Sequence, residues 1–378
     1  MSKTKKKNRR FKFSRHLKKA KRARFFIGSI LILLLLLATF TRLDQAHKKT
    51  AANTANNVVA PPDTCAQNNT ITFSCYKSEL TDITTQNGPQ AAFALIKKQY
   101  STVPYIKSQC HQLAHVIGRA AYAKYGNIAD AFAHGDQFCW AGYYHGMMEQ
   151  VADEQGTANF LANLNNICVP IAQKARYSFD HYNCVHGLGH GVMEALDGNL
   201  FQSLYACDKI TDSWERQSCY GGTFMQNILT VQSPDETVDH SSAYLKADQP
   251  MYPCTAISDQ YKEQCYLMQT SYALQVENYN FSSVFELCAN TSAPYRATCY
   301  QSLGRDASGQ SVSNKDTTKA TCLLGKDFEA ESNCVIGAAK DFISYFHSDL
   351  QARQLCTSLP SSLQSICSST VTSYYASF

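Results

Sequence analysis

The spacing of the cysteines constrains the fold of this chain more than any other feature of its sequence. Of 16 cysteines, nine open an apolar helical pattern, at positions 75, 110, 139, 184, 219, 265, 299, 334 and 367. Successive members of this set lie 35, 29, 45, 35, 46, 34, 35 and 33 residues apart. A repeat of about 34 residues with two helices per unit is typical of an α-solenoid. We therefore predict an all-α fold of two-helix repeats. The alternative is a compact, irregular helical domain.

The other seven cysteines each end a short helical pattern, 10 to 16 residues before a helix-opening cysteine. All 16 lie beyond residue 60, and an even number in an exported chain indicates disulfides. We predict that each helix-ending cysteine pairs with the next helix-opening one, which leaves Cys110 with Cys139 by exclusion. The predicted pairs are 65/75, 168/184, 207/219, 254/265, 288/299, 322/334, 356/367 and 110/139. Each closed loop of roughly 10–15 residues would stabilise the fold by about 2–3 kcal/mol through the unfolded state.

The length of the repeat and its cysteine spacing are similar to those of tetratricopeptide and Sel1-like repeats, including secreted versions with a disulfide in every repeat. The resemblance lies in the period and in the cysteines. It implies stacked two-helix units with a long concave face. A protein or an envelope polymer would bind on such a face.

The N-terminus predicts a membrane anchor. Residues 1–24 hold 13 Lys or Arg and no acidic residue, and an apolar run of 16 residues follows at 25–40. The positive-inside rule places 1–24 in the cytoplasm and makes 25–41 a signal anchor that crosses the cell membrane once. Cleavage of this segment as a signal peptide is the alternative. Residues 42–64 are small and polar, as in a flexible stalk, and 65–378 form the outer domain.

The charge of the outer part argues against a nucleic-acid partner. The formal net charge of +5 comes from the basic tail, because 35 Lys and Arg less those 13 leave 22 against 30 Asp and Glu, a balance of −8. An acidic exterior repels phosphate backbones. The chain also lacks a Cys-x-x-Cys-His motif for haem and any P-loop or dinucleotide fingerprint for a nucleotide.

Three rows of metal-ligand side chains recur at helical spacing within 110–194. They supply seven candidate ligands: His111, His115, His145, Glu149, His186, His190 and Glu194. In the third row, two histidines and a glutamate lie four residues apart, so on a helix they share one face. The second row repeats its His and Glu at the same offsets, six and ten residues after the leading cysteine.

Neutral imidazole and carboxylate suit zinc, iron, manganese or copper. Neighbouring helices pack roughly 8–10 Å apart, a distance that ligand side chains span. We therefore predict a zinc site or a di-metal (iron or manganese) centre. Seven ligands are too many for one tetrahedral ion, so either two ions bind, or one binds and Glu149 or Glu194 acts as a catalytic base. The His-x-x-x-His and His-x-x-x-Glu spacings are similar to those of the di-iron site in hemerythrin-like bundles.

The sequence is compatible with two different functions. One is metal chemistry, either metal-dependent hydrolysis or a redox centre. The other is a non-enzymatic scaffold on the cell surface whose histidines are structural, with imidazoles hydrogen-bonded to neighbouring groups. The glycines beside the histidines predict close helix approach, but His-Gly-Leu-Gly-His-Gly would equally suit a loop, and a loop would remove the shared face.

Overall fold

The computed structural model describes residues 59–172, 178–233, 242–312 and 314–376, and these parts contain helices and no strand. This confirms the predicted all-α class. The long helices are α3 (Phe73–Asn87), α6 (Cys110–Tyr125), α8 (Gly142–Gln155), α12 (Phe179–Ala195), α14 (Ser213–Gln232), α15 (Asp259–Val276), α17 (Ala293–Gln310), α19 (Phe328–Phe346) and α21 (Ser361–Ala376). The shorter ones are α2 (Thr64–Gln67), α4 (Pro89–Gln99), α5 (Pro104–Ser108), α7 (Ile128–Ala133), α9 (Thr157–Ala162), α10 (Leu164–Ile167), α11 (Val169–Ala172), α13 (Leu200–Cys207), α16 (Phe281–Ala289), α18 (Lys315–Cys322) and α20 (Leu350–Ser358).

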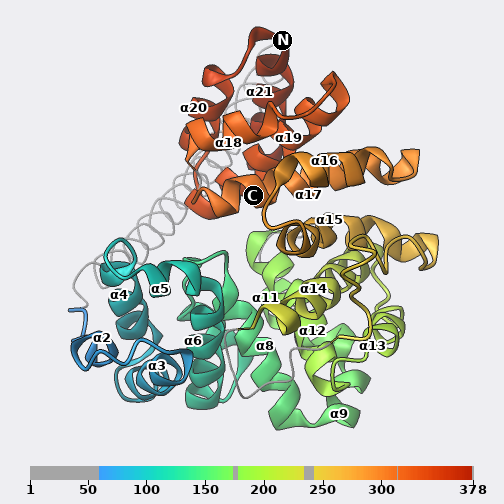
Figure 1. Ribbon diagram of the computed structural model, residues 1–378. Coiled ribbons are helices and arrows are strands. Elements are labelled where there is room, and N and C mark those ends of the chain that lie inside the picture. The colour runs from blue at the N-terminus through green and yellow to red at the C-terminus, as the bar shows by residue number, and fades with distance from the viewer. Residues whose placement is uncertain (1–58, 173–177, 234–241, 313, 377–378) are drawn as a thin grey trace, which may run out of the picture. The chain divides into compact units, whose positions relative to one another are not determined.

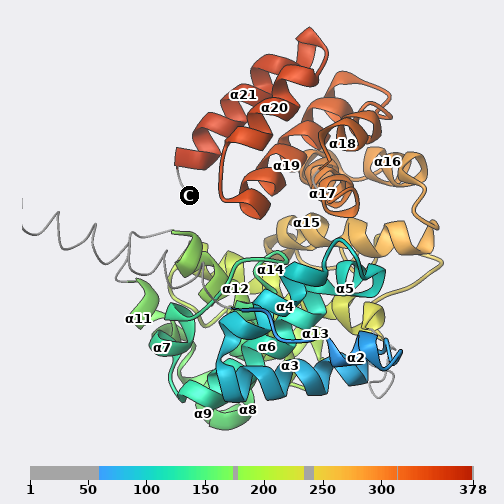
Figure 2. The same cartoon turned by 90° about the vertical axis from the view of Figure 1, so that its left-hand side faces the viewer.

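Each long helix packs against the next long helix along the chain, from α3 and α6 through α8, α12 and α14 to α21. Figures 1 and 2 show α15, α17, α19 and α21 stacked in chain order. One short helix precedes each of α14, α17, α19 and α21, as a two-helix unit requires. α7 lies between α6 and α8, but three short helices, α9, α10 and α11, lie between α8 and α12, so this part departs from that unit. A tetratricopeptide-like solenoid therefore stays a prediction.

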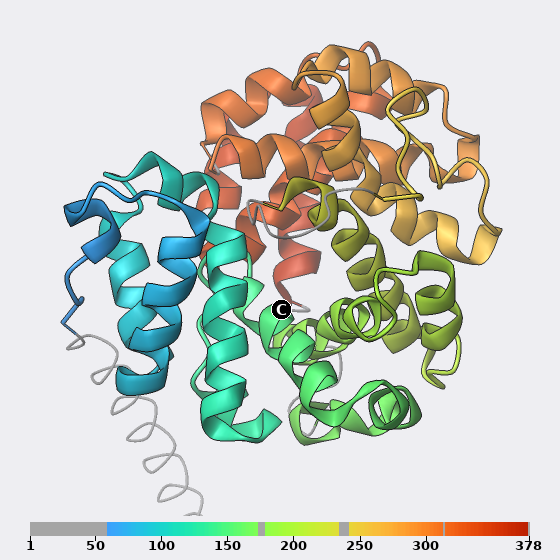
Figure 3. The ribbon, with the colours of Figure 1, turned by 60° about the horizontal axis from the view of Figure 1, so that its bottom comes forward.

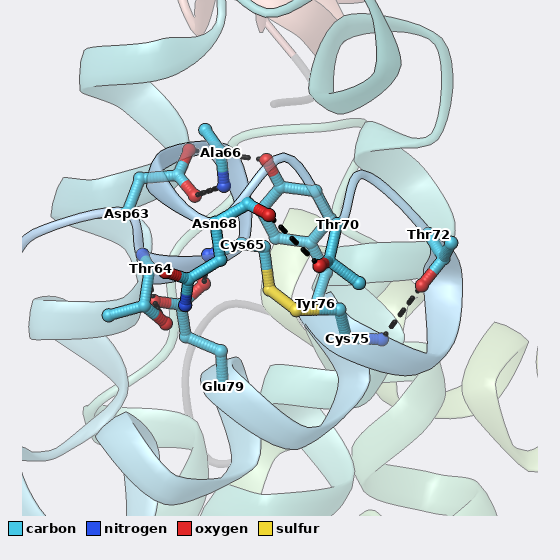
Figure 4. Close-up of a disulfide and its surroundings, with 10 residues drawn as sticks. All are labelled: Asp63, Thr64, Cys65, Ala66, Asn68, Thr70, Thr72, Cys75, Tyr76 and Glu79. Carbon is cyan, nitrogen blue, oxygen red and sulfur yellow. Dashed lines mark hydrogen bonds between the residues drawn. A yellow bond between two sulfur atoms is a disulfide. The ribbon is translucent and has the colours of Figure 1, made fainter.

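All eight predicted disulfide pairs are confirmed: 65–75, 110–139, 168–184, 207–219, 254–265, 288–299, 322–334 and 356–367. In the first of them, Figure 4 shows how Cys65 of α2 joins Cys75 of α3. Asp63 caps α2 through the backbone N–H of Ala66, and its second oxygen accepts from the Tyr76 hydroxyl at 3.2 Å. The disulfide thus fixes a short helix whose start is already tied to the long one.

Helix starts follow from capping side chains. Asn199, Asp212, Asn280, Asn314 and Asp327 each precede a helix and accept a hydrogen bond from a backbone N–H in its first turn. Such a cap satisfies a donor that has no partner within the helix, and it contributes about 1 kcal/mol. The polar turns between the repeats therefore set where each helix of the repeat begins.

The His-Gly-Leu-Gly-His-Gly segment is helical, because it lies within α12. The loop alternative is wrong, and the reason is packing. A Cβ on Gly187 would meet Met148 and the Tyr144 carbonyl of α8, whereas a Cβ on Gly189 would overlap the backbone of α14 at Cys219. The glycines give α12 two faces of close backbone approach, and this gain in packing offsets their low helix propensity.

The end of α19 returns to the histidine-rich part of the chain. The Tyr345 ring lies 4.8 Å from Trp140, next to Cys139, and the His347 ring lies 5.0 Å from Phe179 at the start of α12. These contacts bring the end of α19 against residues next to α8 and α12 that are far away in the sequence. The histidine rows are therefore covered by helices on more than one side.

Within the described ranges, no helix is both long and apolar enough to cross a membrane. The predicted cytoplasmic tail 1–24 and the predicted anchor 25–41 lie outside these ranges, as does most of the predicted stalk 42–64. The last residues of that stalk belong to the folded part, because Asp63 is buried and caps α2.

The contact between α6 and α8 gives a test of close backbone packing. A Cβ on Gly146 would overlap the backbone of His115, and neither helix can move without disturbing both histidine rows. We expect Gly146→Ala to lower the free energy of unfolding in urea by about 1–3 kcal/mol.

Gly309→Ala in α17 is the matched control. The nearest atom to its added Cβ is Trp140 Cζ2 at 3.9 Å, so it should raise the free energy of unfolding by about 0.5–1 kcal/mol. Equal stability of the two variants would contradict the close-approach argument.

Candidate metal centre

Three neighbouring helices each contribute one row of side chains to a single cluster. α6 carries His111 and His115, α8 carries His145 and Glu149, and α12 carries His186 and His190. Within each row the two residues are four apart and so lie on one face. α6 packs on α8 and α8 on α12, as the adjacent teal and green helices of Figure 3 show. The structure thus brings together six of the seven predicted ligands.

These six residues form three overlapping groups whose ligand atoms lie within 4.8 Å of one another. The groups are His111/His115/His145, His145/His186/His190 and His115/Glu149/His190. The rings of His145 and His190 stack at 4.4 Å between centroids, and His115 lies 5.4 and 5.5 Å from these two rings. One continuous cluster is formed, in which His115, His145 and His190 each belong to two groups.

Hydrogen-bond partners hold the Nδ1 atom of four imidazoles, and three of these partners lie outside the cluster. His111 Nδ1–H donates to the Cys139 carbonyl at 2.9 Å, and His115 Nδ1–H donates to Glu149 Oε1 at 3.0 Å. His190 Nδ1 lies 2.7 Å from Gln226 Oε1, and His186 Nδ1 lies 3.3 Å from the Tyr182 hydroxyl. A carbonyl and a carboxylate only accept, so these contacts fix the proton on Nδ1 of His111 and His115. The Nε2 atoms of both rings are thereby directed to the cluster.

The inner nitrogens are short of hydrogen-bond partners. His111 Nε2 and His115 Nε2 face each other at 3.2 Å. Within the described part of the chain, His186 Nε2, His190 Nε2 and His145 Nδ1 are buried without any partner. Buried polar atoms are usually paired, and a group left unpaired costs roughly 1–3 kcal/mol. The cluster therefore concentrates several uncompensated acceptors in one small volume.

Burial keeps these imidazoles neutral. Burial, with the neighbouring His115, lowers the pKa of His111 to about 3, and burial with the nearby Arg305 charge lowers the pKa of His186 to about 3. Burial also lowers the pKa of His145 and of His190 well below the ordinary value, and other imidazoles of the cluster add to the effect. Neutral imidazole is the form that binds a metal ion.

Glu149 is an ionised carboxylate inside the cluster. Burial on its own raises the pKa of Glu149, but His115 and Arg119 outweigh it and bring that pKa below the usual range. Its two oxygens accept from His115 Nδ1 and from Arg119 at 3.1 Å. Glu149 also lies 3.9 Å from His190 Nδ1. Glu149, which belongs to α8, therefore lies close to histidines of both other helices, α6 and α12.

Glu194, the seventh predicted ligand, lies outside the three groups. Its side chain is 38% exposed and sits 3.6 Å from the Arg119 guanidinium. Burial and the nearby Glu149 raise the pKa of Glu194. Glu149 and Glu194 both follow the leading cysteine of their row by ten residues. Because α12 packs between α8 and α14, however, Glu194 lies at the rim of the cluster.

Four groups around the cluster were not predicted from the sequence: Arg119, Tyr182, Gln226 and the Cys139 carbonyl. Two of them continue a row, because Arg119 follows His115 by four residues and Tyr182 precedes His186 by four. That spacing could have revealed them. Gln226 lies on α14 and the Cys139 carbonyl in a turn with positive φ, so neither follows from the row pattern.

The chain matches no protein-family model, and no curated protein or solved structure is significantly similar to it.

The buried neutral imidazoles predict a loss of stability in acid. For a histidine whose folded pKa is lowered to about 3, the unfolded chain takes up a proton near pH 6.5 and the folded chain does not. The free energy of unfolding therefore falls by about 2 kcal/mol per such histidine between pH 7 and pH 5. We expect His186→Gln to show a smaller loss in this interval than the parent chain, by about that amount, in urea titrations with a chelator present.

The difference between the two chains isolates the histidine. Burial raises the pKa of Asp341 to about 6, which works in the opposite direction in both proteins and cancels in the comparison. Equal pH dependence of the parent and His186→Gln would show that His186 is not held neutral by burial.

Proposed function

We propose that this chain is a membrane-anchored, extracytoplasmic helical-repeat protein whose main function is to bind a transition metal between α6, α8 and α12. The ligands are the imidazoles of His111, His115, His145, His186 and His190, with Glu149 as ligand or as the partner that orients His115. The metal is zinc, or a di-metal iron or manganese centre.

The proposal rests on the different hydrogen bonding of the two nitrogens in each imidazole ring. In metal sites, the nitrogen that does not bind the ion usually donates to a carboxylate, a carbonyl or a similar group, which fixes the tautomer and the ring. His111, His115 and His190 follow this pattern through Cys139, Glu149 and Gln226. A purely structural histidine has no need to leave its second nitrogen buried and unpaired. Several such nitrogens at one place indicate a cation.

The ligand set favours a metal that accepts nitrogen donors. Imidazole suits zinc, copper and iron, whereas magnesium and calcium take oxygen ligands. Five imidazoles and one carboxylate exceed the four ligands of a tetrahedral ion. Two ions would use the donors more completely than one, with His145 or His115 near both. The stoichiometry of binding distinguishes a zinc site from a di-metal centre.

The same geometry bears on the chemistry at the centre. The lowered pKa of Glu149 makes it a weak general base, although it was one of the two bases expected for hydrolysis. Glu194 has a raised pKa and is the better base, and it would act at the rim through a water molecule. A metal-dependent hydrolase would use Glu194 in this way, whereas a redox centre would need neither glutamate as a base.

A second function has its own support. The long helices pack in chain order and each later unit carries one disulfide, and this arrangement supports a solenoid scaffold as the proposal. In this version the concave face binds a protein or an envelope polymer outside the cell, and the predicted signal anchor at 25–41 holds the chain in the membrane. The histidines would then serve only packing, and the units from α15 onward would carry the function.

Metal analysis separates the two functions. We expect the full chain, treated with chelator and then dialysed against zinc, iron, manganese or copper, to retain about one to two equivalents of one metal by mass spectrometry. His190→Ala should lose most of the bound metal, because His190 belongs to two of the three ligand groups.

His134→Ala is the matched control, since His134 donates to the Asp130 carbonyl outside the cluster. It should retain the metal of the parent chain. Circular dichroism shows whether each variant is folded. A folded parent chain that retains no metal would refute the metal centre and favour the scaffold.

A further inference from the structure

Arg119 forms ion pairs with three carboxylates at one edge of the histidine cluster. Its guanidinium lies 3.1 Å from Glu149 Oε2 and 3.6 Å from Glu194 Oε1, and it also pairs with Asp153. One positive charge thus faces three carboxylates from two helices, α8 and α12. The arrangement is more than a surface salt bridge, because Glu149 is also a member of a candidate ligand group.

The exposure of the side chains shows that this edge of the cluster meets the solvent. From outside inward, the exposed fraction falls from 41% for Asp153 and 38% for Glu194 to 31% for Arg119. It falls further to 12% for His115, and then to 7% for Glu149 and 0% for His190. The two exposed carboxylates lie at the outer end of this series, and the fully buried His190 imidazole lies at its inner end. A cation moving along this series would exchange water for carboxylates, and carboxylates for imidazoles.

Resting on the metal centre proposed above, we propose that Asp153, Glu194 and Glu149 form the port through which a divalent cation reaches the buried imidazoles, with Arg119 as a removable counter-charge. Asp153 and Glu194 attract the hydrated ion and replace part of its water shell. Glu149 receives the ion when Arg119 leaves it, and the unpaired nitrogens of His190 and His186 complete the transfer.

Electrostatics explains why an arginine belongs in such a port. Three carboxylates this close would repel one another, and two of them are partly removed from water, so without a cation they would destabilise the apo protein. Arg119 neutralises part of that charge in the metal-free state. Its side chain carries the charge on a long stem and is one-third exposed, so it can swing into solvent when a divalent ion brings a larger charge to the same place. In the metal-free chain Arg119 therefore closes the port, and the metal ion replaces its charge on binding.

The test measures how fast the apo chain takes up Zn²⁺ or Co²⁺ in stopped flow, with a metal-sensitive dye or the cobalt absorption as the signal. Asp153→Asn and Glu194→Gln should slow association about three- to tenfold at low ionic strength, because each removes an attracting charge. Added salt should shrink these differences. Arg119→Gln should speed both uptake and release, and Arg119→Lys, which keeps the charge, should change both rates less than Arg119→Gln does.

Glu329→Gln is the matched control, because Glu329 is a half-exposed carboxylate paired with Arg296 at 3.5 Å, remote from the cluster. It should take up metal at the parent rate. If Asp153→Asn and Glu194→Gln also load at the parent rate while metal binds, the port is refuted and the metal centre stands. If no variant and no parent chain binds metal, both proposals fall. A slow Arg119→Gln variant would show that Arg119 supports the site instead of closing it.

Discussion

The histidine cluster depends on the close approach of the backbones of α6, α8 and α12. Glycines stand where each pair of helices touches, and an added Cβ at Gly118 or Gly146 would overlap the facing helix. Without this closeness, the ligand atoms of each group of three residues could not lie within 4.8 Å of one another. Small residues on facing helices do the same in other tightly packed helix pairs, where they let backbones approach. The site is thus built by residues that take no part in its chemistry.

The close packing of the α6, α8 and α12 backbones has an energetic cost that the rest of the fold offsets. Each glycine inside a helix costs about 1 kcal/mol relative to alanine, and each unpaired buried nitrogen costs more. Eight disulfides that close loops of 10 to 29 residues reduce the entropy of the unfolded chain and compensate for part of this. The capped helix starts and the contacts of α19 with Trp140 and Phe179 hold the same helices from outside. Stability held elsewhere allows an unfavourable cluster to persist, which is common at functional sites.

Much of this organisation could be predicted from the residues alone. Cysteine spacing defined the eight disulfides because each pair links neighbours in sequence, so local geometry decides it. The i, i+4 rows defined six members of the cluster because the helical period fixes which side chains share a face. Glu194 could not be placed in the same way: its row position repeats that of Glu149, but the rotation of α12 against α8 is set by tertiary packing. Gln226 could not be predicted for the same reason, because only the contact of α12 with α14 brings it to His190. The three short helices between α8 and α12 also depart from the predicted two-helix unit.

The contact between His111 and His115 gives a physical reason to expect a cation in the cluster. Both rings donate through Nδ1 to acceptors that cannot donate in return, so their Nε2 atoms meet at 3.2 Å as two lone pairs. Two lone pairs at that distance repel unless a cation lies between or beside them. In the proposed metal-bound form, the ion would take that role at the inner end of the cluster, while Arg119 would give way to it at the outer end. A divalent ion that displaces Arg119 in this way would keep the buried Glu149 carboxylate paired throughout. A charged group buried this deeply requires such a partner.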